Sequence, residues 1–193
     1  MGTQTDTRSR IQEVAIGLFT EQGYEATSLR EIAEALGVTK AALYYHFRTK
    51  EDIVASLVED RIAALDELIA WAAGRPPTAE TRRELILRYS AQMTRGRHHE
   101  VMQFMDRNKT ALQGHVKVDL MRDRMGALMQ SLYGPEDPLP VRLKRSMALF
   151  AIHAAWFFIR EESTTDEQRA GAGLEVALEL ADASGVDPGP VGR

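Results

Sequence analysis

The sequence contains no cysteine and no hydrophobic run long enough to span a membrane. The absence of cysteine excludes disulfides, thiolate metal sites and a cysteine nucleophile, and it fits a reducing cytoplasm. The longest nearly apolar stretch, residues 147–159, contains 13 residues, whereas a membrane-spanning helix needs roughly 20. It therefore predicts a buried helix. No charged-then-apolar leader opens the chain, so we expect a cytoplasmic protein with no signal peptide and no membrane partner.

Sequence motifs of common enzyme classes are also missing. There is no G-x-S-x-G, no P-loop and no H-E-x-x-H, because His99-Glu100 is followed by Gln103 where a second zinc ligand would stand. His98 and His99 would diverge by about 100° on a helix, which favours a solvated helix end over a metal site. Gly171-Ala172-Gly173 follows no strand, so helix packing explains it better than dinucleotide binding. We expect no catalytic residue, no metal and no cofactor, and a small helical enzyme is the less favoured alternative.

The chain has no excess of positive charge, since its net charge is −4. The first fifty residues nevertheless hold six basic and six acidic side chains, so the whole negative balance lies beyond them. Residues 38–50 contain Lys40, Arg48 and Lys50 and no acid. A local basic strip of this kind can bind DNA even on an acidic protein, because the distribution of charge matters more than its sum.

Apolar residues recur at helical spacing along the chain, and no stretch alternates as a half-buried strand does. This pattern predicts an all-α fold of about nine helices. The first runs from near Thr7 to Gly23, the second follows an N-cap at Thr27, and the third follows an N-cap at Thr39. The others are expected at 50–73, 79–95, 98–113, 116–133, 140–161 and 166–183. Gly/Pro-rich segments at 74–78 and 134–140 separate helices, and residues 184–193 are expected to be disordered.

Residues 28–47 predict a helix-turn-helix. Ala33 is small where two helices cross, and Gly37 stands where the turn requires a positive φ. The inward face is supplied by Ile32, Leu36, Val38 and Leu43. In this arrangement the second helix lies in the major groove, so Lys40 reaches a base edge or a phosphate. Phosphate contacts are expected from Thr39, Tyr44, His46 and Lys50 and from the helix N-terminus at Thr27. We assign Tyr45 and Phe47 to the core, and Thr27 and Thr39 also have a purely structural explanation as caps.

The segment from about Arg8 to Leu57 resembles the DNA-binding domain of TetR-family regulators. The run Leu43-Tyr44-Tyr45-His46-Phe47, followed by Lys50, is a highly specific mark of that family. The other matching residues are Ile11, Ala15, Leu18, Phe19, Gly23, Tyr24, Thr27, Ile32, Ala33, Gly37, Val38 and Leu57. The resemblance covers about a quarter of the chain, and the remainder agrees only in the number and length of its helices.

The resemblance implies different roles for the residues of the DNA-binding segment. The DNA backbone would be held by Thr27, Thr39, Ala42, Tyr44, His46 and Lys50. Lys40 and Ala41 would lie nearest the bases, with Arg30 as a third candidate reader. Ala41 and Ala42 are small, so they are limited to apolar contact such as that with a thymine methyl group. The implied organisation is a helix-turn-helix domain at 1–50 and a ligand-binding and dimerisation domain at 51–183.

All seven methionines after the first lie between Met93 and Met147. Methionine is flexible and polarisable, so it fills plain cores and also lines adaptable cavities. The residues alone slightly favour a plain core, whereas the resemblance favours a pocket, because such regulators typically hold a small-molecule inducer there. On the second interpretation a small apolar, aromatic-tolerant ligand would contact some of Met102, Met105, Met125, Met129, Phe150 and Trp156.

The helix expected at 140–161 is apolar nearly all round over residues 148–159, so it must be buried on most sides. One face of it is expected to pack against a second copy of the chain. The resemblance implies a homodimer through a four-helix bundle, with an interface that includes Ala151, Ala155, Phe158, Gly173, Leu174, Ala177 and Leu178. Two-fold symmetry would then set the two recognition helices about 34–36 Å apart, or a multiple of that, on a near-palindromic operator.

These expectations together describe a DNA-binding transcriptional regulator, and the resemblance favours a repressor that a small apolar ligand releases from its operator. Activation by the ligand is an open alternative. So is a helical ligand-binding or interaction protein that no longer reads DNA, although the retention of Lys40, Tyr44, His46 and Lys50 argues against it.

Overall fold

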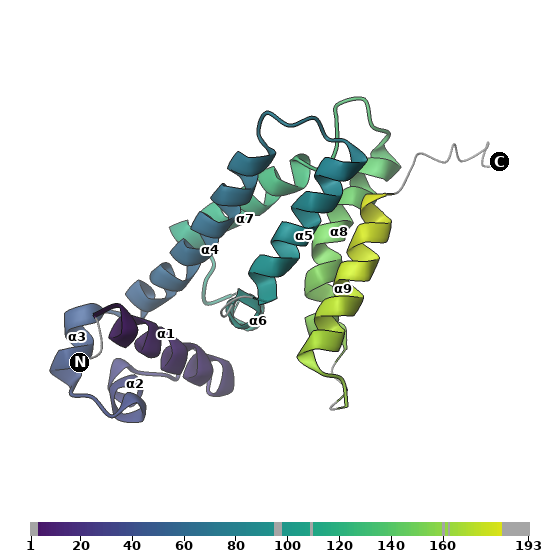
Figure 1. Ribbon diagram of the computed structural model, residues 1–193. Coiled ribbons are helices and arrows are strands. Elements are labelled where there is room, and N and C mark those ends of the chain that lie inside the picture. The colour runs from purple at the N-terminus through teal and green to yellow at the C-terminus, as the bar shows by residue number, and fades with distance from the viewer. Residues whose placement is uncertain (1–3, 95–97, 109, 160, 162, 183–193) are drawn as a thin grey trace. The chain divides into compact units, whose positions relative to one another are not determined.

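The computed structural model describes residues 4–94, 98–108, 110–159, 161 and 163–182, and all regular structure in these ranges is helical (Figure 1). The helices are α1 (Gln4–Glu21), α2 (Leu29–Leu36), α3 (Lys40–His46), α4 (Lys50–Ala72), α5 (Ala79–Thr94), α6 (His98–Arg107), α7 (Val116–Gln130), α8 (Leu139–Phe158) and α9 (Asp166–Ala181). The predicted all-α fold is confirmed. The predicted disordered tail, 184–193, lies outside the described residues. Among the helices that are described, none combines the length and apolarity needed to cross a membrane.

The largest difference from the predicted helices concerns α6, which ends at Arg107 rather than near residue 113. Asn108 turns its side-chain amide back to the Phe104 carbonyl, with Nδ2 donating over 2.9 Å. The chain then proceeds through turns to Gly114, whose φ of 78° lies in the left-handed region. A left-handed residue cannot continue an α-helix, so a separate helix, α7, begins at Val116.

The residues group into two compact units. One lies within residues 1–63 and 97–122, and the other within residues 64–96 and 123–193. Helices α4 and α7 each run from one unit into the other. Helix α6 therefore belongs to the same unit as the N-terminal helices, and it packs against α1.

The first unit is organised around a buried apolar cluster on short helices. Helix α1 packs on α2, and α2 packs on α3. The largest side chains that are shielded from solvent here include Ile11, Phe19, Ile32, Leu43 and Phe47. Gly37 joins α2 to α3 with a φ of 71°, as the sequence predicts, and its N–H reaches back to the Glu34 carbonyl at 3.1 Å.

The two predicted N-caps have different outcomes. Thr39 does cap α3, since its Oγ1 accepts from the Ala42 N–H at 3.2 Å. The prediction for Thr27 is wrong, because Ser28 caps α2 and forms a reciprocal capping box with Glu31. Thr27 is only 1% exposed, and its hydroxyl donates to the Gly23 carbonyl at 2.9 Å. Its side chain thus closes the turn after α1 instead of starting α2.

The second unit depends on a close approach of α8 and α9, which α5 covers. A Cβ on Gly173 would lie 3.1 Å from the Ile152 Cα and 3.2 Å from the Ala151 carbonyl oxygen. A side chain at this position would crowd the α8 backbone, so glycine favours the close approach. Gly173, Ala155 and Ala177 are all buried within a single protomer.

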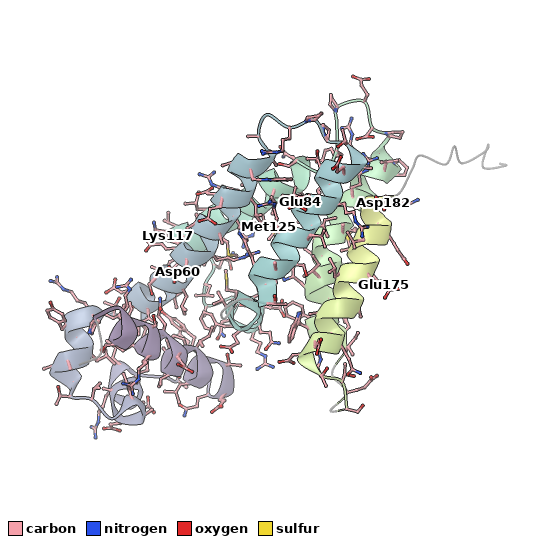
Figure 2. All side chains as sticks on the ribbon, in the orientation of Figure 1. Asp60, Glu84, Lys117, Met125, Glu175 and Asp182 are labelled. Atoms are coloured by element: carbon pink, nitrogen blue, oxygen red, sulfur yellow. The ribbon has the colours of Figure 1, made fainter. Side chains whose placement is uncertain are left out.

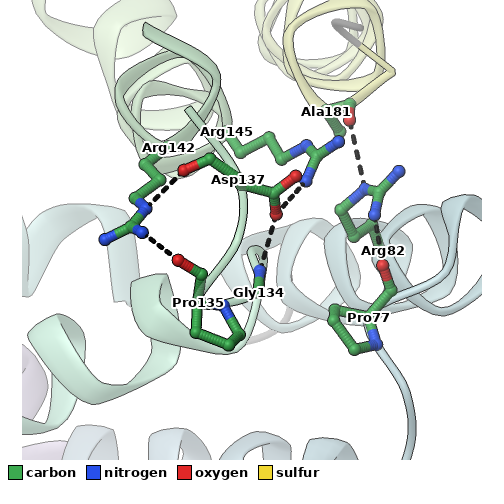
Figure 3. A network of polar contacts seen from close by, with 8 residues as sticks. All are labelled: Pro77, Arg82, Gly134, Pro135, Asp137, Arg142, Arg145 and Ala181. Atoms are coloured by element: carbon green, nitrogen blue, oxygen red, sulfur yellow. Dashed lines mark hydrogen bonds and ion pairs between the residues drawn. The ribbon is translucent and has the colours of Figure 1, made fainter. Parts of the chain in front are cut away.

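Both Gly/Pro-rich segments are tied to helices of the second unit by arginines (Figure 3). The Asp137 carboxylate accepts from the Gly134 N–H and from Arg145 Nη1, each over 2.6 Å. Arg82 donates to the Pro77 carbonyl and, over 3.2 Å, to the Ala181 carbonyl at the end of α9. Burial, followed by the charge of Arg145, lowers the pKa of Arg82. These loops are therefore parts of the packed unit.

Replacing Gly173 with valine should lower the free energy of unfolding by about 1–3 kcal/mol, because the added side chain meets backbone atoms that have little freedom to move. The matched control is Gly171→Val, two residues earlier on α9, where a Cβ meets nothing within 4 Å. The control should change stability by no more than about 0.5 kcal/mol. Urea unfolding followed by circular dichroism measures both, and equal effects would contradict the proposed role of the close contact.

Candidate nucleic-acid interface

Most side chains of helix α3 are not buried in the core of the first unit. Only Leu43 of its seven residues is buried, and Phe47 at its C-cap is buried as well. These two residues are four apart, so they lie on one face of the helix. His46 is half-buried, and the exposed residues of the helix are Lys40, Ala41, Ala42, Tyr44 and Tyr45.

The assignment of Tyr45 to the core is wrong, because 74% of this residue is exposed. Its ring meets that of His46 edge-on, with 5.3 Å between ring centroids. The helical spacing contained the signal: if Leu43 and Phe47 define the buried face, a residue two positions after Leu43 lies about 200° away. Tyr45 is thus a further candidate for DNA contact, which the sequence reasoning missed.

Residues from four parts of the first unit line a hollow of about 410 Å³. It is formed by the turn after α1, the first turn of α2, one side of α3 and the beginning of α4. The predicted DNA-binding residues that it brings together are Thr27, Arg30, Lys40, Tyr44 and Lys50. The α2 N-terminus opens into the same region, and helix N-termini favour anions. The hollow thus combines the amines of Lys40 and Lys50 with the carboxyl groups of Glu25 and Glu51.

Lys50 is held in place by the turn before α2. Its Nζ donates to the Tyr24 carbonyl at 2.7 Å and lies 3.3 Å from the Glu25 carbonyl oxygen. The same ammonium group lies 4.6 Å from the centre of the Tyr24 ring. An ammonium has three N–H donors, so two carbonyl contacts leave one for a phosphate oxygen. Lys40 has a looser aromatic neighbour, with Nζ 5.4 Å from the centre of the Tyr44 ring.

Several acidic side chains near the hollow are engaged by their own chain. Glu34 pairs with Arg30 at 2.6 Å, and this bond raises the pKa of Arg30. Hydrogen bonds from the Ser28 side chain and backbone lower the pKa of Glu31. The backbone N–H of Glu51 lowers that residue's pKa, and Tyr24 donates to its Oε1 at 2.9 Å. Arg30 must therefore leave or share Glu34 to read a base.

The predicted ligand-binding residues lie on three helices, α6, α7 and α8. Met102 and Met105 lie on α6 in the first unit, and Met105 is buried. In the second unit Met125, labelled in Figure 2, and Met129 lie on α7, and Trp156 on α8 is half-buried. Phe150 is 48% exposed. These residues belong to two different units, so a single ligand pocket that they share stays a prediction.

A polar group in the second unit lies among the apolar residues and was missed from the sequence. The buried Tyr89 hydroxyl is hydrogen-bonded to His153 Nε2 and lies 3.9 Å from Met125 Sδ. Its ring meets the His153 ring edge-on at 5.6 Å between centroids. Because Tyr89 and His153 are 64 residues apart in the chain, no local spacing could have brought them together.

One face of α8 carries exposed apolar side chains at helical spacing, namely Leu139, Leu143, Met147, Phe150 and Phe158. Phe158 is 83% exposed. Along this face lies a groove of about 530 Å³ whose lining is almost entirely apolar and includes Ala151 and Leu180. Leu174 and Leu178, also predicted at a dimer interface, are half-buried on α9. An apolar face of this length is unusual for a monomer.

Within the residues that the structure describes, no three potential ligands gather in a way that could hold a metal ion. The side chains of His98 and His99 lie outside this description.

The comparisons with known proteins concern the N-terminal segment by sequence and the whole chain by fold. Residues 11–57 match the family described as bacterial regulatory proteins, tetR family. The transcriptional regulator AcrR of Shigella flexneri is 44% identical over 63 residues, which are 33% of this chain and 29% of AcrR. The chain thus matches less than a third of the length of this curated relative.

Solved structures resemble nearly the whole chain. AmtR of Mycobacterium smegmatis has a TM-score of 0.67 at 22% identity, covering 91% of this chain and 86% of AmtR. AibR, solved with isovaleryl coenzyme A and operator DNA, has a TM-score of 0.58 at 24% identity and covers 86% and 96%. SmeT, solved with triclosan, has a TM-score of 0.61 at 21% identity and covers 97% and 100%. At these identities the likeness concerns the fold.

Proposed function

We propose that this chain is a member of the TetR family of bacterial regulatory proteins, which its residues 11–57 match, and that it binds operator DNA as a homodimer and represses transcription until a small apolar ligand releases it. The observation that carries the proposal is the exposed face of α3 beside the hollow that holds Lys40, Tyr44 and Lys50. Residues 1–50 would read DNA, and residues 51–183 would bind ligand and form the dimer. The protein would act by binding alone, without catalysis, in the cytoplasm.

The geometry of α3 supports insertion into the major groove. A helix with one buried face and small residues at its exposed start can approach base edges closely. Ala41 and Ala42 are both exposed there, with Lys40 beside them. Tyr44, Tyr45 and Lys50 would contact the sugar-phosphate backbone on either side of the groove, and Thr39 and His46 would add to these contacts.

The exposed face of α8 supports the homodimer. In a two-fold interface the same patch meets its own copy, so an apolar stripe needs no other complementary partner. Phe150 and Phe158 would fill the groove of the partner. Burial of Ala155, Gly173 and Ala177 inside one protomer means that these residues would shape the α8–α9 pair rather than touch the other copy.

The second unit supports a ligand that is mainly apolar and carries one polar group. Met125, Met129 and Trp156 offer adaptable apolar contact, and Tyr89 with His153 offers a buried hydroxyl and imidazole beside Met125. Two fold neighbours, SmeT with triclosan and AibR with isovaleryl coenzyme A, were solved with ligands that combine apolar and polar parts. The ligand would release the protein from DNA if it binds better to a state in which the two recognition helices of the dimer no longer fit the operator.

Alanine at Lys40 or Tyr44 should weaken binding to a near-palindromic site upstream of the protein's own gene by about one to two orders of magnitude, because each removes a direct DNA contact worth about 1–3 kcal/mol. Fluorescence anisotropy with labelled duplex, at several salt concentrations, gives the affinities. The control is Arg83→Ala, an exposed arginine in the second unit. Equal binding by the wild type and both variants would contradict the proposed reader, as would binding that is the same on all sequences.

Glutamate at Phe150 should convert the dimer to a monomer, since it would bury a charge in the apolar groove. Sedimentation equilibrium measures the mass, and circular dichroism checks that the fold persists. Val116→Glu is the matched control, because Val116 is 78% exposed on α7 in the first unit. A monomeric wild type, or a dimer that tolerates the change at Phe150, would rule out this interface.

Triclosan, used as an apolar phenolic probe, should quench the fluorescence of Trp156 and weaken operator binding. The two tryptophans provide an internal control, since Trp71 lies at the end of α4. The quenching should persist in Trp71→Phe and disappear in Trp156→Phe. If neither triclosan nor isovaleryl coenzyme A changes the Trp156 signal or the DNA affinity, the ligand part of the proposal loses its support.

A further inference from the structure

We propose that the end of α6 positions the DNA-binding surface, and that Asn108 is the residue through which it does so. This inference rests on the proposed function, because it concerns how Lys50 is presented to a DNA phosphate. All the contacts involved lie within the first unit. Asn108 itself would touch no DNA, so it is a positioning residue.

The side-chain amide of Asn108 joins two pieces of backbone that are far apart in sequence. Its Oδ1 accepts from the Tyr24 N–H at 3.3 Å, across 84 residues. Its Nδ2 donates to the Phe104 carbonyl at 2.9 Å. One end of the amide is therefore fixed on the last turn of α6, and the other end holds the turn between α1 and α2.

Tyr24 transmits this contact to the start of α4. Its N–H bonds to Asn108, while its carbonyl accepts from Lys50 Nζ at 2.7 Å. Its ring lies 4.6 Å from the same ammonium group, and its hydroxyl donates to Glu51 at 2.9 Å. Burial, followed by the Glu51 hydrogen bond, raises the pKa of Tyr24, so the hydroxyl stays protonated and keeps donating. The carbonyl and the ring of Tyr24 therefore set the place of the Lys50 charge, and its hydroxyl ties the same tyrosine to the start of α4.

An aromatic cluster keeps α6 seated on this turn. The Phe104 ring stacks on Phe19 with 5.4 Å between centroids and lies 6.1 Å from the Tyr24 ring. Phe19 and Tyr24 meet edge-on at 5.1 Å. Arg107 adds a longer contact, with Nη1 3.4 Å from the Thr20 carbonyl oxygen. Packing thus brings α6 to the turn, and Asn108, directly after α6, supplies a directional bond to the Tyr24 backbone.

The backbone of this turn has little steric restraint at Gly23, so side-chain bonds fix its geometry. Gly23, directly before Tyr24, has a φ of 93°, and a Cβ there would meet nothing within 4 Å. Glycine has more backbone freedom than any other residue. Thr27 holds the carbonyl side of the Gly23–Tyr24 peptide, and Asn108 holds its N–H side. Loss of the Asn108 bond would leave this peptide with the Thr27 contact, and the carbonyls of Tyr24 and Glu25 that hold Lys50 would shift with it.

The first test needs no DNA and uses the full chain. In the wild type the Tyr24 ring should shift the ε-methylene NMR signals of Lys50 upfield, because the ammonium lies close to the ring. Asn108→Ala should move these signals toward ordinary lysine values and speed hydrogen exchange at the Tyr24 amide at least tenfold. An unchanged Lys50 signal in Asn108→Ala would overturn the inference whether or not the protein binds DNA.

The second test is a double-mutant cycle with Lys50→Ala, read as the dependence of DNA affinity on salt. Each phosphate contact contributes a slope of about −0.9 to log K against log salt. Asn108→Ala should flatten the wild-type slope by roughly 1–2 for a dimer, and it should have no further effect in the Lys50→Ala background. A mutation that merely unfolds part of the protein would lower the active fraction and leave the slope unchanged.

The two proposals fail in different ways. If the wild type shows no site-specific binding while the NMR changes occur, the repressor proposal fails and the Asn108 contact still positions Lys50. If the wild type binds its site and Asn108→Ala binds with the same slope, the repressor proposal stands and the role of Asn108 is wrong. Additive effects of the two substitutions on the slope would also overturn it.

Discussion

Burial of Leu43 and Phe47 is the constraint on which the exposed, DNA-facing side of α3 in our proposal depends. Helix α3 has only seven residues, and a helix this short is unstable in water on its own. It exists because these two side chains, one turn apart, enter the core of the first unit, where Arg8 also lies 4.6 Å from the centre of the Phe47 ring. Anchoring on one narrow face leaves the rest of the helix outside. The same burial that makes α3 stable therefore exposes Lys40, Tyr44 and Tyr45.

In the second unit, too, burial of one face of a helix leaves its other face exposed. Gly173 lets α9 approach the α8 backbone so closely that one face of α8 is buried inside the protomer. The opposite face, from Leu139 to Phe158, then stays exposed among the residues that the structure describes. Tight packing on one side and an apolar stripe on the other are thus two consequences of one helix that is hydrophobic nearly all round.

The sequence predicted the helices well because each has a local signal. Apolar spacing located all nine described helices, and Gly37 and Thr39 marked the turn and the cap of the reader. Errors arose where two local explanations competed. Thr27 and Ser28 are both good caps, and only the buried position of Thr27 decides between them. The aromatic ring of Tyr45 suggests a core residue, whereas its spacing from Leu43 places it on the exposed side of α3. Contacts across many residues, such as Asn108 with Tyr24 and Tyr89 with His153, have no local signature at all.

The net negative charge of the chain does not oppose the proposed binding, because three acids near α3 are engaged by hydrogen bonds or an ion pair, although Glu25 also lines the hollow. Glu31 is bound by the Ser28 backbone and hydroxyl, Glu34 by Arg30, and Glu51 by the Tyr24 hydroxyl. Each bond restrains a carboxylate and offsets part of its field, whereas Lys40 lies 5.4 Å from the centre of the Tyr44 ring and is exposed. More distant acids are screened beyond a Debye length of about 8 Å at physiological salt. Attraction to DNA would therefore depend on a few placed cations, and their placement would matter more than their number.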